Sequence, residues 1–173
     1  MSDVTLVNIY GDDTGSIENL VAHTQGLLHR AYSIFVFNDE DELLLQRRAE
    51  SKNHSSGLWS NTCCSHPLPG EHVIESAHRR LREEMGIGCE LEEIFCLTYK
   101  EPMSDGTTEY EYNHIMTGRS NATPQANPIE VQEWKWVPVA SLCEDILRFP
   151  DQYTQWLKLI IRIRVTKLLK GIQ

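Results

Sequence analysis

The sequence predicts a single α/β domain in which β-strands and two helices form layers around one core. Short apolar runs separated by turn residues predict strands, and two longer segments repeat their apolar residues at helical spacing. The chain has 173 residues, 40% of them apolar and 24% charged, with no repeat, low-complexity tract or linker. A chain of this length buries a core of its own. The order of strands, central helix, strands and terminal helix is typical of a layered α/β fold.

The predicted strands are runs rich in β-branched, aromatic and leucine residues. They cover residues 5–10, 31–37, 42–47, 93–99, 107–116 and 133–137. The segment 38–41, Asn-Asp-Glu-Asp, separates the second run from the third and indicates a hairpin turn, because Asn and Asp tolerate turn conformations.

The two predicted helices cover residues 71–85 and 151–170. Apolar residues of the first recur every four positions, at Val73, Ala77, Leu81 and Met85. Gly86 follows, where a helix stop is expected. The second helix has a broad apolar face, made of Tyr153, Trp156, Leu157, Ile160, Ile161 and Leu168.

Composition argues against several classes of protein. The formal net charge of -9 disfavours general nucleic-acid binding. No apolar run reaches the roughly 18–20 residues of a membrane span, and the first residues lack the layout of a signal peptide. The five cysteines include no C-x-x-C pair, which favours free thiols over disulfides or structural zinc. We therefore expect a cytoplasmic protein. Because the protein is acidic, it would need local cations or a metal to hold an anionic substrate.

The segment 61–67, Asn-Thr-Cys-Cys-Ser-His-Pro, places two cysteines next to each other, shortly before a histidine. Successive side chains of an extended segment point to opposite faces. Cys64 and His66 would therefore share one face, and Cys63 would point away. We expect Cys64 to be the thiol that does chemistry and Cys63 to be a small buried side chain.

Two carboxylates and three histidines form the next candidate group. Glu109 and Glu111 would point to the same face of a strand, about 7 Å apart. Like charges held this close repel each other unless a cation or a shared proton intervenes, although a solvated strand face remains the alternative. With His23, His29 and His66 they would suit a manganese, zinc, magnesium or iron site of about six ligands. The spacing of His23 and His29 predicts that a loop folds them inward, and the remaining histidines, at 54, 72, 78 and 114, are expected to be ordinary surface or core residues.

Three further charged residues are candidates for a phosphate site. Glu84 lies in the last turn of the helix 71–85, where a carboxylate is mildly unfavourable, and is a candidate ligand for a hard divalent cation. The alternative is an exposed charged helix face. Arg48 and Lys52 are candidates for phosphate contacts, with a solvated strand end as the alternative.

Together these residues resemble type 1 isopentenyl-diphosphate isomerases, which are enzymes of the Nudix fold. The resemblance extends from about residue 4 to about residue 160, and its most specific segments are 26–32, 43–48, 59–67, 79–86, 99–106 and 109–111. Most of the general Nudix pattern is present, at Glu71, Arg79, Leu81, Glu83, Glu84, Gly86 and Ile87. Ser65 stands in place of the first glycine and Arg80 in place of one glutamate. Loss of that carboxylate weakens the case for diphosphate hydrolysis, and the isomerases share this departure.

The resemblance implies a Nudix-type α/β/α sandwich of mixed sheets flanked by helices, as one domain over residues 1–173. Its core would cover about residues 30–140, with a strand and the metal-binding histidines in 4–29 and the terminal helix at 151–170. The ligands of one Mg²⁺ or Mn²⁺ ion, with Zn²⁺ as an alternative, would be His23, His29, His66, Glu109 and Glu111. Glu84 would hold a second Mg²⁺ that bridges to the substrate diphosphate.

By the same resemblance, Cys64 and Glu111 are the two acid/base groups, and which of them gives the proton in the forward direction stays open. The remaining implied roles are a hydrogen bond to the glutamate from Tyr99, an aromatic lid formed by Trp156, and diphosphate contacts from Arg48 and Lys52. Asn19 departs from a lysine that is usual in the family, which puts one diphosphate contact in doubt.

The resulting functional hypothesis is divalent-metal-dependent isomerisation of isopentenyl diphosphate to dimethylallyl diphosphate through a tertiary carbocation, in isoprenoid biosynthesis. The expected partner is a small prenyl diphosphate, and a monomer is expected, with an oligomer left open. Two rivals remain: a Nudix pyrophosphohydrolase, against which Arg80 counts, and a metal-dependent binding module without turnover. Pure binding needs none of Cys64, Glu111 and Trp156.

Overall fold

The computed structural model describes residues 3–52, 54–103 and 105–170, with the side chains of residues 164–170 outside the description. The expected apolar contact of Leu168 therefore lies outside the described residues. The strands are β1 (Asp3–Val7), β2 (Asp13–Glu18), β3 (His29–Phe37), β4 (Glu42–Arg48), β5 (Trp59–Ser60), β6 (Cys63–Ser65), β7 (Leu91–Pro102), β8 (Thr108–Arg119) and β9 (Val131–Pro138). The helices are α1 (Asn19–Gln25), α2 (Val73–Met85), α3 (Val139–Arg148), the 3-10 turn η1 (Pro150–Gln152) and α4 (Gln155–Lys170).

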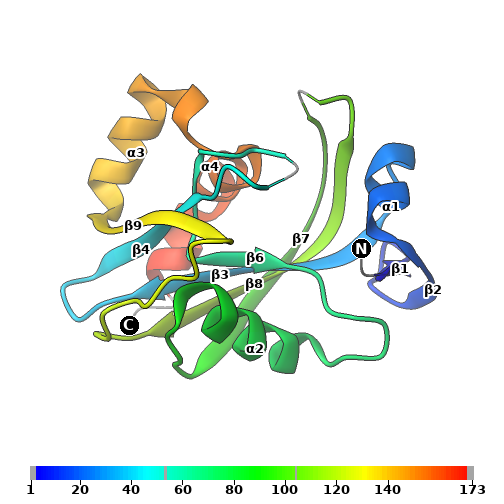
Figure 1. Cartoon of the computed structure of the whole chain (residues 1–173), viewed down its shortest axis with the longest axis horizontal. Helices are drawn as coiled ribbons and strands as arrows, with labels where there is room; N and C mark the ends of the chain where they lie inside the picture. The colour runs from blue at the N-terminus through cyan, green and yellow to red at the C-terminus, as the bar shows by residue number, and fades with distance from the viewer. Residues whose placement is uncertain (1–2, 53, 104, 171–173) are drawn as a thin grey trace.

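β3 is the central strand of one mixed, curled sheet. It pairs with β8 in parallel and with β6 antiparallel, and its two ends meet β1 and β4. β7 pairs with the outer edge of β8, while β4 carries β5 and β9. Helix α2 covers one face of this sheet, α3 and α4 cover the other, and α1, β1 and β2 gather at the end where the N-terminus lies (Figure 1).

The alternation of side chains along β3 divides the interior into two cores. Ile34 and Val36 point toward α2, whereas Phe35 and Phe37 point toward α3 and α4, because successive strand residues face opposite sides. All four are at most 1% exposed. Burial of such a side chain contributes about 1.5–3 kcal/mol, so both faces of the sheet stabilise the fold.

Five of the six predicted strands and both predicted helices are present, and the predicted α/β class is confirmed. The strand predicted at residues 5–10 is only partly present, because β1 ends at Val7 and the backbone N–H of Gly11 donates to the carbonyl of Asn8 in a turn. The turn at 38–41 is confirmed as well, because Asn38 and Glu42 close it by hydrogen bonds. The terminal helix begins at Gln155 rather than at 151, since the backbone N–H of Thr154 donates to the carbonyl of Trp59.

Several elements were not predicted, namely α1, β2, β5 and α3, whereas β6 agrees with the extended conformation on which the placement of Cys63 and Cys64 was based. β2 is almost wholly exposed and polar, and so lacks the apolar alternation that identifies a strand. α1 has only seven residues, which is too short for a helical repeat to be visible.

Gly86 fixes the end of α2 and the loop packed over it. Its φ of 65° is left-handed, and a Cβ at this position would lie 2.5 Å from the carbonyl oxygen of Gln125. The backbone N–H groups of Gln125 and Asn127 donate to the carbonyls of Met85 and Glu84. This capping holds the last turn of α2, and with it Glu84, in place. In the described part of the chain, no helix has the length and apolarity required to cross a membrane.

Candidate active site

A cavity of about 210 Å³ lies against the face of the sheet where β6, β3 and β8 run side by side. Ten of the eleven predicted site residues line it: His23, Arg48, Lys52, Cys64, His66, Glu84, Tyr99, Glu109, Glu111 and Trp156. The eleventh, His29, is fully buried beside two of them, Glu109 and Glu111. The sequence-predicted residues are therefore brought together in one place.

Strand register explains this convergence. Ser33 of β3 lies opposite Cys64 of β6, and His29 of β3 lies opposite Glu111 of β8. Because alternate residues of a strand share a face, His29 and Ser33 carry their partners to the same side of the sheet. The expected placement of the two cysteines is confirmed: Cys64 lines the cavity, and Cys63 is fully buried on the α2 side.

The Cys64 thiol is a protonated group in the metal-free protein. Its sulfur lies 3.0 Å from Asn61 Oδ1 and 3.5 Å from Ser33 Oγ. Burial raises the pKa of Cys64 to about 12, outweighing these hydrogen bonds, which lower it. At neutral pH the cavity therefore contains a neutral thiol that has a proton to give.

Glu111 is held on both carboxylate oxygens. The Tyr99 hydroxyl donates to Oε2 over 2.6 Å and the Asn113 amide to the same oxygen over 2.8 Å, while His66 Nε2 lies 3.2 Å from Oε1. Burial alone would raise the pKa of Glu111, but its hydrogen bond to His66 and the charge of that ring lower it overall. Burial and the neighbouring Glu111 hold the pKa of Glu109 well above its usual value. The metal-free carboxylate pair thus carries one negative charge.

The histidines form a cluster suited to a metal ion. Ring centroids of His23, His29 and His66 lie 4.7–5.5 Å from one another. Their ligand atoms lie within 4.8 Å of one another, and the same holds for the group of His29, Glu109 and Glu111. His29 Nδ1 donates to the carbonyl of Leu27 over 2.8 Å, which turns Nε2 toward the cluster.

Unpartnered buried atoms point to the same site. Among the described residues, His23 Nε2, His29 Nε2 and Glu109 Oε2 are buried without a hydrogen-bond partner. Such atoms are costly unless something binds them, and a divalent cation would satisfy all three. Imidazole and carboxylate donors suit Mg²⁺, Mn²⁺ or Zn²⁺, so the residues present fit a divalent ion.

The predicted loop between His23 and His29 is present, but the helix that carries the first of them was not predicted. His23 lies in the last turn of the short helix α1, not in a loop, while His29 begins β3. Gly26, with a left-handed φ of 61°, ends α1 and turns the chain back between them. Asn19, at the start of α1, places its amide nitrogen 3.4 Å from His66 Nδ1, so it contacts a histidine of this cluster.

Burial of the imidazoles predicts acid sensitivity of the metal-free protein. Desolvation lowers the pKa of His23 and of His29 from 6.5 to about 4. The unfolded chain then binds more protons than the folded chain between about pH 6.5 and about pH 4. The contribution of these histidines to the free energy of unfolding should therefore be at its maximum above pH 6.5, and it should fall as the pH drops from about 6.5 to about 4. Urea unfolding in chelator at several pH values measures this slope.

His23→Gln should reduce this pH slope, whereas His78→Gln, a change on α2 outside the cavity, should leave it unchanged. A free energy of unfolding that stays constant between pH 6.5 and pH 4 would contradict the expected acid sensitivity.

Arg48 and Glu84 are buried, and the exposed alternatives considered for them are wrong. Arg48 is 8% exposed, and its guanidinium lies 5.2 Å from the ring centroid of Trp156. Glu84 is 2% exposed and accepts hydrogen bonds from Arg80 over 2.6 Å and from Gln46 over 3.0 Å.

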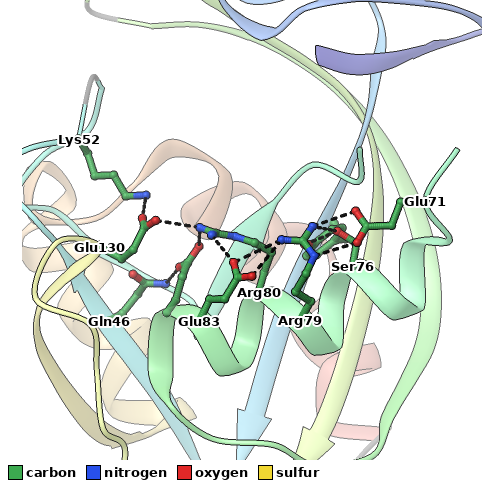
Figure 2. A network of polar contacts seen from close by, with 10 residues as sticks. Gln46, Lys52, Glu71, Ser76, Arg79, Arg80, Glu83 and Glu130 are labelled. Atoms are coloured by element: carbon green, nitrogen blue, oxygen red, sulfur yellow. Dashed lines mark hydrogen bonds and ion pairs between the residues drawn. The ribbon is translucent and has the colours of Figure 1, made fainter. Parts of the chain in front are cut away.

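Arg80 bonds three glutamates at this end of the cavity, of which Glu84 is one. The other two are Glu83 and Glu130, and Glu130 in turn pairs with Lys52, so one network joins α2 to the loops above it (Figure 2). The replacement of a Nudix glutamate by arginine therefore places a cation where the pattern would place a carboxylate. The sequence offered a signal for this contact, because Arg80 and Glu84 are one helical turn apart.

His54 was expected to be an ordinary residue, and this was wrong. It lines the cavity, with Nδ1 lying 3.8 Å from Glu109 Oε1 and its ring centroid 6.0 Å from that of Trp156. No local pattern marks His54, since only the folding of the loop after β4 brings it inward. Ser33 and Asn113, which also line the cavity, were missed for the same reason.

Comparisons with known proteins identify a matching family model and similar proteins of known name. A family model described as NUDIX domain matches residues 27–158. Isopentenyl-diphosphate Delta-isomerase 1 of Aromatoleum aromaticum is 48% identical over 158 residues, covering 91% of this chain and 89% of that protein. Isopentenyl-diphosphate Delta-isomerase of Pectobacterium atrosepticum is 44% identical, covering 92% of this chain and 89% of that protein.

Solved structures show the same fold at lower identity. A crystal structure of a Deinococcus radiodurans protein matches with a TM-score of 0.77 at 20% identity, covering 94% of this chain and 99% of that one. A NUDIX hydrolase from Nitrosomonas europaea matches with a TM-score of 0.61 at 16% identity, covering 82% of this chain and 88% of that one. These two likenesses concern the fold alone.

Proposed function

The chain belongs to the NUDIX domain family and, within it, to the isopentenyl-diphosphate Delta-isomerases, and from this premise we propose that it converts isopentenyl diphosphate to dimethylallyl diphosphate. The observation that carries the proposal is the convergence of the Cys64 thiol and the Glu111 carboxylate on one buried cavity. We also propose that the protein acts in the cytoplasm as a monomer on this small substrate, in isoprenoid biosynthesis and without a nucleic-acid partner.

The reaction moves a double bond by one position, so one carbon gains a proton and another loses one. An unactivated alkene is a poor base, and its protonation gives a tertiary carbocation. Such a step needs one acid and one base at the substrate. The free protein has one acid and one base at the cavity, because burial keeps Cys64 protonated while hydrogen bonding keeps Glu111 ionised. Tyr99 and Asn113 hold the Glu111 carboxylate in position by donating to Oε2.

Trp156 is proposed to stabilise the carbocation. It lines the cavity and is 5% exposed, and its Nε1 donates to Ser60 Oγ over 2.9 Å, which fixes the ring. A π face beside a desolvated cation contributes about 2 kcal/mol or more. The buried walls also exclude water, which would otherwise trap the cation as an alcohol.

The diphosphate is proposed to bind at the end of the cavity that holds Arg48 and Lys52. Arg80 joins them there as a third cation that the sequence did not identify as a substrate contact. Glu84 is proposed to hold a Mg²⁺ ion that neutralises the diphosphate. Since Arg80 and Gln46 already bond its two carboxylate oxygens, Glu84 is held in a fixed orientation before the ion arrives.

The second proposed ion is Mg²⁺ or Mn²⁺, with Zn²⁺ as an alternative. Its proposed ligands are His23, His29, His66, Glu109 and Glu111. A cation at this place would supply charge that fixes Glu111 and shifts its proton affinity.

Proton NMR of isopentenyl diphosphate with the protein and Mg²⁺ in D₂O tests the function. We expect dimethylallyl diphosphate to accumulate and deuterium to enter its C4 methyl group, because the added proton comes from solvent-exchanged side chains. Chelator should stop the exchange, and added Mg²⁺ or Mn²⁺ should restore it.

Release of phosphate with no deuterium in the carbon chain would instead indicate a pyrophosphohydrolase. Tight substrate binding with no turnover in any metal would indicate a binding module, and either outcome would overturn the proposed isomerase activity.

A further inference from the structure

A second group of metal-ligating side chains lies on the β7–β8 hairpin, outside the cavity. Cys96 of β7 lies opposite His114 of β8, and Glu93 precedes Cys96 by three residues. In a regular strand, residues three apart point to opposite faces. The register shifts between Glu93 and Phe95, and this irregularity turns Glu93 to the side on which Cys96 and His114 lie.

The three side chains are already close enough to share one ion. Cys96 Sγ lies 3.3 Å from Glu93 Oε1 and 3.4 Å from His114 Nδ1, and His114 Nδ1 lies 2.8 Å from Glu93 Oε2. In a tetrahedral site with Zn–S near 2.3 Å and Zn–N or Zn–O near 2.0–2.1 Å, ligand atoms lie about 3.3–3.6 Å apart. The contact between His114 and Glu93 must lengthen most and the two sulfur contacts slightly, and Glu93 is an exposed side chain that can move to present one oxygen to the ion.

The other ring nitrogen of His114 does not compete for the ion. His114 Nε2 is buried, with no hydrogen-bond partner among the described residues, so Nδ1 is the atom presented to Cys96 and Glu93. The ring of Tyr112 packs against the His114 imidazole in a T-shaped arrangement, with the two ring centroids 5.4 Å apart, and restricts its movement.

This cluster is separate from the histidine and glutamate cluster in the cavity. Glu109 and Glu111 point into the cavity from β8, whereas His114, an odd number of residues further along, points to the opposite face. The cavity cluster contains no thiol ligand among its candidate groups, while this one does. The two clusters therefore differ in donor chemistry as well as in place.

We propose that Glu93, Cys96 and His114 form a second metal site, which binds Zn²⁺ or a similar thiophilic divalent ion, with water as the fourth ligand. Thiolate, imidazole and carboxylate are the donors such ions prefer, and their charges balance the ion. Burial and Glu93 raise the pKa of Cys96 to about 11 in the metal-free protein, so binding releases the thiol proton. The ion would tie β7 to β8 across the back of the strand that carries Glu109 and Glu111.

Cobalt spectroscopy of the full chain tests the site. Metal-free protein titrated with Co²⁺ should develop the near-ultraviolet charge-transfer band of a thiolate–Co²⁺ bond, and Zn²⁺ should abolish it. Cys96→Ser should lose the band while keeping the circular dichroism of the parent. Two matched cysteine changes, Cys143→Ser on α3 and Cys64→Ala in the cavity, should retain it.

Glu93→Gln gives a second readout that preserves the thiol. It should keep the band but weaken Co²⁺ binding by about tenfold or more, as the loss of a supporting ligand does. No charge-transfer band in the parent, a band that survives Cys96→Ser, or a band lost in Cys64→Ala would each overturn the second site. None of these readouts depends on turnover, so they test the second metal site independently of the isomerase function.

Discussion

Replacing Cys64 with alanine is expected to lower the rate of isomerisation by about 10²–10⁴-fold, the range that a positioned proton-transfer group contributes. The thiol lines the cavity, is protonated at neutral pH and is aimed by Asn61 and Ser33. Its removal takes away one of the two proposed proton-transfer groups and should leave the fold intact, since Cys64 is only partly buried. Steady-state kinetics with isopentenyl diphosphate, and circular dichroism of each variant, measure the effect.

Cys63→Ala is the matched control for this change. Cys63 is the neighbouring residue and is 0% exposed, but it packs against α2 on the other face of the sheet. Its truncation should cost about 1 kcal/mol of stability through the small void it leaves, and should keep most of the turnover. Equal losses of turnover in the two variants would contradict the assignment of the two strand faces.

Replacing Glu111 with glutamine is expected to reduce turnover at least as strongly as Cys64→Ala. Glutamine keeps the shape of the side chain but loses its charge and its ability to take a proton. Its amide oxygen can take the place of Oε2 and still accept from the two donors there, Tyr99 Oη at 2.6 Å and Asn113 Nδ2 at 2.8 Å. The loss of turnover should therefore come from the missing charge and proton acceptor rather than from a disturbed fold.

Metal content separates the two roles proposed for Glu111. If the residue is also a ligand, Glu111→Gln should retain less divalent metal after dialysis than the parent, measured by elemental analysis, whereas Cys64→Ala should retain the parent amount. Glu92→Gln, an exposed change on the same hairpin, is the control for both measurements. Full turnover in Glu111→Gln would remove this residue from the mechanism.

Much of the candidate site could be predicted from the sequence because it rests on strand alternation. Cys64 and Cys63 lie on opposite faces of a strand, whereas Glu109 and Glu111 share one face, because successive side chains of a strand alternate between its two faces. The helix 71–85 could be predicted in the same way, since its apolar spacing and Gly86 are local signals.

Residues that reach the cavity through loops or ion pairs could not be predicted in this way. His54 is brought beside Glu109 by the path of the loop after β4, and α1, which carries His23, is too short to show a period. The buried state of Glu84 depends on its contact with Gln46, which lies on β4 and meets α2 only in the folded chain.

The sequence by itself determined the fold class, most of the strands and the directions of the candidate side chains that lie on strands, because backbone geometry sets these over a few residues. Only the tertiary structure decided which strands lie side by side, and therefore that Cys64, His29 and Glu111 meet through β3. It also decided the charge states, because burial and neighbouring groups raise the pKa of Cys64 and lower that of Glu111. Proton affinity depends on what surrounds a group in space, and the surroundings exist only once distant segments have packed.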